Sequence, residues 1–122
     1  MTYVQGFLLA VPNANKAAYI ELAEAAAKVF RAHGALSVVE TWGVSVPDGK
    51  LTSFPMAVKL EEDESVVFSW ITWPDKETAD GAIEPSMKEL EDMMGGDTSK
   101  VPFDGKRMIW GGFVPILEEG AA

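Results

Sequence analysis

Residues 102–113, PFDGKRMIWGGF, read as a turn that leads into a β-strand. Asp104 and Gly105 favour the turn, because Gly adopts positive φ at little cost and Asp can hydrogen-bond its own backbone. The β-rich run that follows carries Gly111 and Gly112 in its middle. Glycines weaken a strand, so a pair of them indicates a bulge or the close approach of another group. We therefore expect the last strand of a sheet here, with something packed tightly against it.

The length and composition indicate one globular domain. The chain has 122 residues, of which 48% are hydrophobic and 24% are charged. Both fractions are ordinary for a globular protein, and the length suits a single domain over residues 1–122. We expect only a short flexible tail, residues 118–122.

The charge balance disfavours several partners. Ten basic residues face nineteen acidic ones, which gives a net charge of -9. Binding to nucleic acid or to an anionic membrane surface depends on Lys and Arg neutralising phosphates, so we expect neither partner. The absence of cysteine excludes disulfides, thiolate metal sites and a cysteine nucleophile. The N-terminus lacks the features of a signal peptide, and we expect a soluble cytoplasmic protein.

Four segments have the pattern of strands that are covered on both sides. They are residues 3–11, 36–46, 66–73 and the stretch within 102–113. In the third of them, Val67, Ile71 and Trp73 alternate with Val66, Phe68 and Trp70. Because successive side chains of a strand point to opposite faces, both faces of the predicted sheet are apolar.

Helical spacing of apolar residues predicts two main helices. The first runs over residues 16–33, with Asn13 as its N-cap and Gly34 after its end. The second begins at Lys76 with Asp75 as its N-cap, and Pro85 should break it near residue 83 or 84 before the pattern resumes.

Residues 52–60 are ambiguous between a short helix and an edge strand. Ser53 as an N-cap and the apolar set of Phe54, Ala57 and Val58 favour the helix. Alternation of apolar and polar residues also permits the strand. We expect the helix.

The order of elements is β-α-β followed by β-α-β, which is typical of an α+β, ferredoxin-like sandwich with an antiparallel four-stranded sheet. Two helices can cover only one face of that sheet. Since all four strands are apolar on both faces, the second face needs a partner, and another copy of the same sheet is the simplest one. We therefore expect a homodimer formed by sheet-to-sheet packing.

Six motifs together resemble those of a bacterial family, the domain-of-unknown-function family 1428. They are Tyr3-Val4-x-Gly6-Phe7, Val11-Pro12, His33-Gly34-Ala35, Val46-Pro47-Asp48-Gly49-Lys50, Val66-Val67-Phe68-Ser69-Trp70-Ile71 and Met108-Ile109-x-Gly111-Gly112-Phe113. The resemblance implies a dimeric α/β barrel, in which two ferredoxin-like sheets pack face to face. Related barrels include small monooxygenases, haem-handling enzymes and stress-related proteins. The family has no established activity, so the resemblance assigns no catalytic residue. Gly81 and Pro85 depart from it by making the second helix less regular.

His33 and the tryptophans are the first candidates for a ligand pocket. His33, the single histidine, is either a haem ligand or general base, or a helix residue that covers the edge of the core. Trp42, Trp70 and Trp110, together with Trp73, either line a pocket for a flat organic ligand or fill the core and the dimer interface.

Glu40 and Arg107 complete the set of candidates. Both are charged residues within otherwise apolar strands, and a buried charge must be paired, so we expect a Glu40–Arg107 ion pair. In the alternative interpretation, Arg107 and Lys106 hold the carboxylate of a substrate.

No motif predicts a metal or a cofactor. Nothing has the spacing of metal ligands, and Gly111-Gly112 matches neither nucleotide-binding fingerprint. Three functions remain open. The first is a dimer that binds a small hydrophobic or aromatic metabolite in a pocket between sheet and helices. The second is a cofactor-poor monooxygenase or isomerase, and the third is a structural dimer without an internal site.

Overall fold

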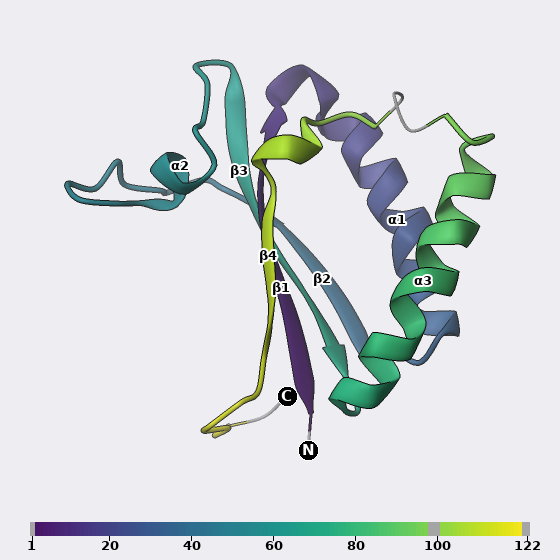
Figure 1. Cartoon of the computed structure of the whole chain (residues 1–122). Helices are drawn as coiled ribbons and strands as arrows, with labels where there is room; N and C mark the ends of the chain where they lie inside the picture. The colour runs from purple at the N-terminus through teal and green to yellow at the C-terminus, as the bar shows by residue number, and fades with distance from the viewer. Residues whose placement is uncertain (1, 98–100, 121–122) are drawn as a thin grey trace.

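A computed structural model describes residues 2–97 and 101–120 of the chain (Figure 1). Its four strands form one antiparallel sheet in the order β2-β3-β1-β4. The strands are β1 (Tyr3–Pro12), β2 (Ser37–Trp42), β3 (Glu64–Trp73) and β4 (Ile109–Phe113). The helices are α1 (Lys16–Ala32), α2 (Phe54–Ala57) and α3 (Lys76–Met93). The predicted α+β class and antiparallel sheet are confirmed, and the order of elements fits a ferredoxin-like fold.

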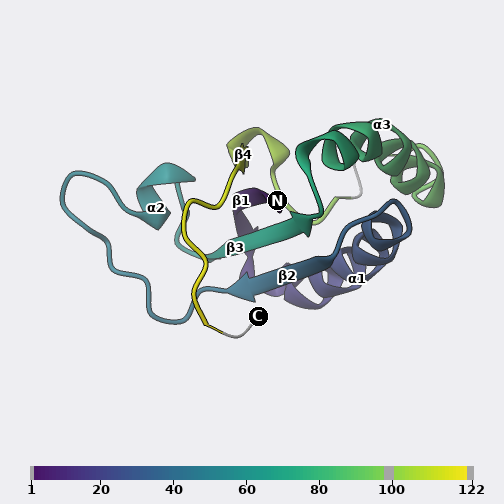
Figure 2. The same ribbon diagram turned by 90° about the horizontal axis from the view of Figure 1, so that it is seen from below.

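The two long helices lie on one side of the sheet. Figures 1 and 2 show α1 and α3 together on that side, while the chain around α2 projects to the other side. We call these sides the helix face and the open face. Residues 98–100 and 121–122 lie outside the described residues, so the predicted tail is described only as far as residue 120.

The helix face carries most of the buried core. Two clusters of buried residues lie there, one around Trp73 and Ile71 and the other around Leu9 and Val67. A third cluster, Ala10, Val58 and Val66, lies under α2 at one end of the open face. The predicted alternation along β3 is therefore confirmed.

The start of α1 differs from the prediction. Asn13–Asn15 forms a 3₁₀ turn, and the helix begins at Lys16 with Asn15 as its N-cap residue. Asn13 does not cap the helix, because its side-chain oxygen accepts a hydrogen bond from the hydroxyl of Ser65 and its backbone N–H donates to the carbonyl of Asp63 at 2.9 Å. The predicted end is confirmed, since Gly34 has a φ of 111°.

The predicted break of the second helix at Pro85 is wrong, because α3 is continuous across it. Pro85 removes one backbone hydrogen bond, the one to the carbonyl of Gly81. Both residues are exposed, so water can reach that carbonyl. On the opposite side, Ala79 and Ala82 are buried, and this tertiary packing outweighs the local cost. The predicted cap is confirmed, since the Asp75 carboxylate accepts a hydrogen bond from Thr78 N at 2.7 Å.

The strand predicted over residues 36–46 is shorter than expected. Trp42 pairs with Val67, and β3 begins at Glu64, so β3 offers few further residues for pairing. The chain leaves the sheet after Gly43 and returns at Val58, which is fully buried. We call residues 44–57 the arm. The arm includes α2, whose N-cap Ser53 accepts a hydrogen bond from Met56 N at 3.1 Å, so the predicted short helix is confirmed.

Candidate functional site

An apolar groove of about 660 Å³ runs along the open face of the sheet. Its lining comes from β1, β3 and β4, which are adjacent in the sheet. The lining residues are Val4, Gly6, Phe7, Leu8, Phe68, Trp70, Thr72, Ile109, Trp110, Gly111 and Phe113. No charged residue is among those that the structure describes in this lining, and apart from Gly the side chains are apolar except for that of Thr72.

Two glycines make the floor of the groove. Gly6 of β1 pairs directly with Gly111 of β4, and paired residues of neighbouring strands point to the same face. Since neither residue has a side chain, the open face carries no side chains at this point of the sheet. A Cβ atom at Gly6 or Gly111 would lie 3.6 Å or 3.4 Å from the ring of Phe113. The hollow exists because both positions are glycine and a phenylalanine ring lies beside them.

Gly112 points to the helix face, and there the predicted close approach is confirmed. A Cβ atom at Gly112 would fall 1.6 Å from the hydroxyl oxygen of Tyr3. The ring of Tyr3 therefore occupies the space that any other side chain would need. The two consecutive glycines of β4 therefore act on opposite faces of the sheet. Gly111 leaves a hollow on the open face, and Gly112 leaves room for the ring of Tyr3 on the helix face.

A row of aromatic rings forms one wall of the groove and continues into the arm. The ring centroids of Phe68 and Trp70 lie 5.3 Å apart, and those of Phe54 and Phe68 lie 5.8 Å apart. These distances are typical of favourable aromatic pairs. Phe54 belongs to α2, so the row links the base of the arm to the centre of the open face.

The groove brings together only two of the predicted pocket residues, Trp70 and Trp110. Trp42 packs against the helix-face cluster of Leu9 and Val67, with Lys16 Nζ 5.1 Å from its ring centroid. Trp73 is fully buried on the same face and donates its indole N–H to Gln5 Oε1 at 2.9 Å.

His33 lies after the end of α1, and its ring joins the two long helices. Its Nε2 is 2.8 Å from Glu89 Oε2 on α3. Both side chains are partly exposed, and neither lines the groove. This contact fits the interpretation of His33 as a helix residue at the edge of the core.

Glu40 lies on the helix face at the edge strand β2. Its carboxylate accepts a hydrogen bond from the hydroxyl of Tyr19 at 2.7 Å, and Ser69 is a second partner. Burial raises the pKa of Glu40 above its usual range, although both hydrogen bonds lower it in part. Burial and the nearby Glu40 carboxylate likewise raise the pKa of Tyr19.

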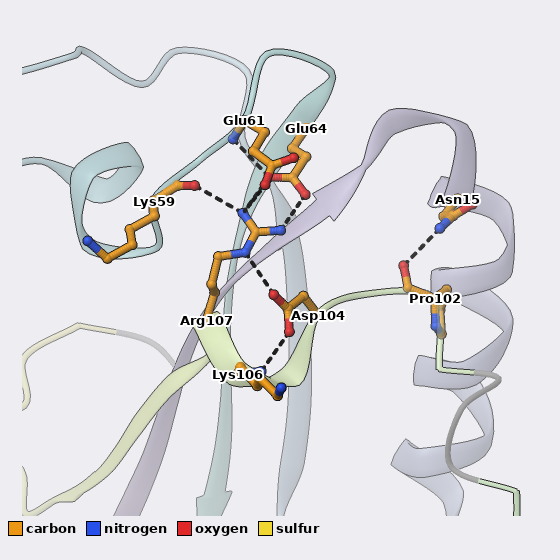
Figure 3. Close-up of polar contacts among 8 residues, drawn as sticks. All are labelled: Asn15, Lys59, Glu61, Glu64, Pro102, Asp104, Lys106 and Arg107. Atoms are coloured by element: carbon orange, nitrogen blue, oxygen red, sulfur yellow. Dashed lines mark hydrogen bonds and ion pairs between the residues drawn. The ribbon is translucent and has the colours of Figure 1, made fainter.

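Arg107 has other partners, so the predicted Glu40–Arg107 pair is wrong (Figure 3). Residues 105–107 form a 3₁₀ turn ahead of β4, which places Arg107 at the start of β3. Its guanidinium donates two hydrogen bonds of 2.7 Å to the carboxylate of Glu64. A further N–H donates to Asp104 at 3.1 Å, and Nη1 also donates to the carbonyl of Lys59 at 3.0 Å.

These contacts make Arg107 a structural clamp. Its hydrogen bonds hold the pKa of Glu64 well below its usual range, and the pKa of Asp104 is lowered by the Lys106 N–H and by Arg107. Because its N–H donors already bind protein oxygens, Arg107 is not positioned to bind the carboxylate of a substrate. The turn predicted at Asp104 is confirmed, since its carboxylate accepts from Lys106 N at 3.0 Å.

The sequence interpretation missed Gly6, Phe68 and Phe113 as parts of the site. A signal was present, because the alternation along the third strand puts Phe68 and Trp70 on one face. What the sequence lacked was the pairing of Gly6 with Gly111, which depends on the register between β1 and β4.

Comparison with known proteins places the chain in a family. The pattern that defines the family described as "Protein of unknown function (DUF1428)" matches residues 2–105. The chain belongs to the DUF1428 family. The resemblance seen in the sequence motifs is thereby confirmed.

The curated relatives match along their full length. "Uncharacterized protein YbaA" of Escherichia coli K12 and that of Shigella flexneri are each 52% identical to this DUF1428 chain over 124 residues, covering 98% of this chain and 100% of the relative. Among solved structures, "De novo designed protein Foldit4" covers 93% of this chain at 13% identity, with 97% of its own length matched and a TM-score of 0.45.

Within residues 2–97 and 101–120, no group of three or more His, Asp or Glu side chains is placed to hold a metal ion. Over the same residues, no helix is both long enough and apolar enough to cross a membrane.

Proposed function

We propose that the chain forms a homodimer in which two open faces meet and enclose a chamber for a small hydrophobic or aromatic molecule. The observation that carries the proposal is the groove of about 660 Å³ on the face that the helices leave uncovered. Pockets for small ligands in proteins commonly have volumes of about 300–1,000 Å³ and are lined mostly by apolar and aromatic side chains.

The lining restricts the chemistry of the ligand. Without a charged group in the described lining, an ionic ligand would lose its hydration and gain no partner. Phe68, Trp70 and Phe113 offer ring edges and faces instead, which suit a flat, neutral aromatic molecule. The hydroxyl of Thr72 could provide one hydrogen bond.

The sequence led us to expect the pocket between the sheet and the helices. The two core clusters occupy that space in the structure, with Trp73 and Val67 fully buried. We therefore place the proposed site on the opposite face, where a second copy would complete it. A barrel of two facing sheets remains part of this proposal.

A monooxygenase or isomerase is the second candidate function, and one observation favours it. Glu40 combines a raised pKa with a hydrogen bond from Tyr19, and a carboxyl with a raised pKa is a candidate general acid or base. Glu40 lies on the helix face, away from the groove lining. We therefore favour binding over catalysis.

The test combines a fluorescent probe with native mass spectrometry. The uncharged probe N-phenyl-1-naphthylamine should bind the wild type with saturation, and native mass spectrometry should detect the dimer. Gly111→Leu fills the floor of the groove and should weaken binding about tenfold or more. Ile83→Ala, at a partly exposed position on α3, is the control and should leave binding unchanged.

The opposite results would contradict the proposal. Equal binding to the wild type and to Gly111→Leu would place the probe elsewhere. A stable dimer that binds no probe would support the third function, a structural dimer without an internal site.

A further inference from the structure

The arm presents apolar side chains to water to an unusual degree. Leu51 is 98% exposed and Val44 is 92% exposed, and Phe54 and Met56 of α2 are about half exposed. Single exposed apolar residues are ordinary on protein surfaces. Four of them fall within 14 consecutive residues that join the sheet beside an apolar groove, and concentrations of exposed apolar side chains mark interaction sites.

Contacts with the sheet hold both ends of the arm, and they determine the side of the sheet from which it projects. Gly43 N donates to the carbonyl of Val66 at 2.8 Å where the arm leaves the sheet, and Val58 is fully buried where it returns. Between them, Phe54 packs against Phe68 of the open face. Figures 1 and 2 both show the arm projecting from the sheet on the side away from α1 and α3. Whatever lies on the open face therefore lies beside the arm.

The charge distribution favours a second copy of the chain as the occupant. At a net charge of -9, two copies repel each other over most of their surface. The groove lacks charged lining residues in the described part of the chain, and the arm adds one acidic and one basic residue, Asp48 and Lys50. The groove and the arm together thus form a region on which two copies can meet with little repulsion between like charges.

The arm enlarges the apolar area that the sheet offers to a partner. Four strands spaced about 4.8 Å apart, with a rise of about 3.3 Å per residue over 5 to 10 residues, cover on the order of 300–600 Å² in plan. A stable interface buries about 800 Å² on each partner. The accessible area of a surface with projecting side chains exceeds its area in plan, so the sheet supplies a large part of this value, and the exposed side chains of the arm supply further apolar area.

We propose that the arm of each protomer clasps the second copy, with Val44 and Leu51 packed against the rim of the partner's groove. Half of the arm, about 7 residues, spans up to about 23 Å when extended, which exceeds the spacing of about 10 Å between packed sheets. Each groove is then closed by Leu51 of the partner subunit, and the chamber is incomplete in one copy alone. The clasp deepens the proposed homodimer and rests on it.

Cysteine labelling tests the clasp directly, because the native chain has no cysteine. In Leu51→Cys the thiol should react slowly with a maleimide at high protein concentration and about tenfold faster after dilution below the dimer dissociation constant. Met93→Cys places the control thiol at an exposed position on α3, and its reaction should not depend on protein concentration. Leu51→Ser should also raise the dissociation constant of the dimer in sedimentation about tenfold, whereas Met93→Ser should leave it unchanged.

Three results would overturn the clasp. If the protein is a dimer and the thiol of Leu51→Cys reacts fast at every concentration, the arm lies outside the interface and the proposed homodimer still stands. Slow labelling at every concentration in a monomer means that the arm folds onto its own sheet. A wild type that sediments as a monomer at micromolar concentration removes the clasp and the proposed homodimer together.

Discussion

The two faces of the sheet are built from the same strands but differ in burial, because the long helices cover one face and leave the other open. On β3, Val67 and Trp73 point to the helix face and are fully buried, whereas Phe68 points to the open face and is 44% exposed. The side chains are equally apolar on both sides, so the hydrophobic effect alone predicts equal burial. The difference arises because two helices can cover one face only. A strand that is apolar on both faces therefore indicates a packing layer on each side of the sheet, and in one copy the two long helices supply a layer on one side (Figure 1).

The largest expected effect separates the two faces by stability. Trp73→Ala removes a fully buried indole and its hydrogen bond to Gln5, and should cost about 3–5 kcal/mol of unfolding free energy. Phe68→Ala should cost about 1 kcal/mol or less in a dilute, dissociated protein, because Phe68 is already partly in water there. Urea unfolding at low protein concentration measures both. Equal costs would mean that the open face is already packed within one copy.

The second prediction concerns the carboxylates of the two faces. Glu64, on the open-face side, should be coupled to Arg107, while Glu40, on the helix face, should not. In a double-mutant cycle of Glu64→Gln with Arg107→Gln, the combined loss of stability should be clearly smaller than the sum of the single losses. The matched cycle of Glu40→Gln with Arg107→Gln should be additive within about 0.5 kcal/mol. Coupling in the second cycle would restore the ion pair that the sequence suggested.

The sequence predicted which face of the sheet a side chain occupies, but it did not predict where the strands begin and end. Alternation alone assigned Val67 and Phe68 to opposite faces, because that assignment depends only on a period of two. The Glu40–Arg107 pair failed because it assumed that Arg107 lies within a strand. The 3₁₀ turn at residues 105–107 delays the start of that strand to Ile109 and brings Arg107 to Glu64.

Two further differences have the same origin in tertiary contacts. Pro85 signals a helix break, but the buried side of α3 holds the helix together. The groove needed the pairing of Gly6 with Gly111, whose positions lie over 100 residues apart in the sequence. Local propensity carries no information about such a pairing.

The third prediction uses the opposite pKa shifts of Glu64 and Glu40, one on each side of the sheet. The pKa of Glu64 is lowered by Arg107, so its contribution to stability is present above about pH 4.5 and is lost as the pH falls through the lower, folded-state pKa. The pKa of Glu40 is raised by burial, so its contribution is present below about pH 4.5 and is lost as the pH rises through the higher, folded-state pKa.

Urea unfolding across a pH series distinguishes the two carboxylates. Glu64→Gln should flatten the dependence of stability on pH below about 4.5, and Glu40→Gln should flatten it above that value. The Asp104 carboxylate, whose pKa is also lowered, will add to the loss at acid pH in both variants. The assignment fails if both variants change the same limb of the profile.

The smallest expected effects come from one glycine on each side of the sheet. Gly81 lies on the exposed side of α3, where a Cβ atom would meet nothing within 4 Å, so Gly81→Ala should raise stability by about 0.5–1 kcal/mol. Gly6→Ala places its Cβ at an ordinary contact distance of 3.6 Å from Phe113 and should change stability by a similar or smaller amount. Their effects on the groove differ, because only Gly6→Ala fills part of its floor. We therefore expect Gly6→Ala to weaken binding of N-phenyl-1-naphthylamine and Gly81→Ala to leave it unchanged. Equal probe binding by both variants, with their stabilities intact, would show that the glycine floor has no role in binding.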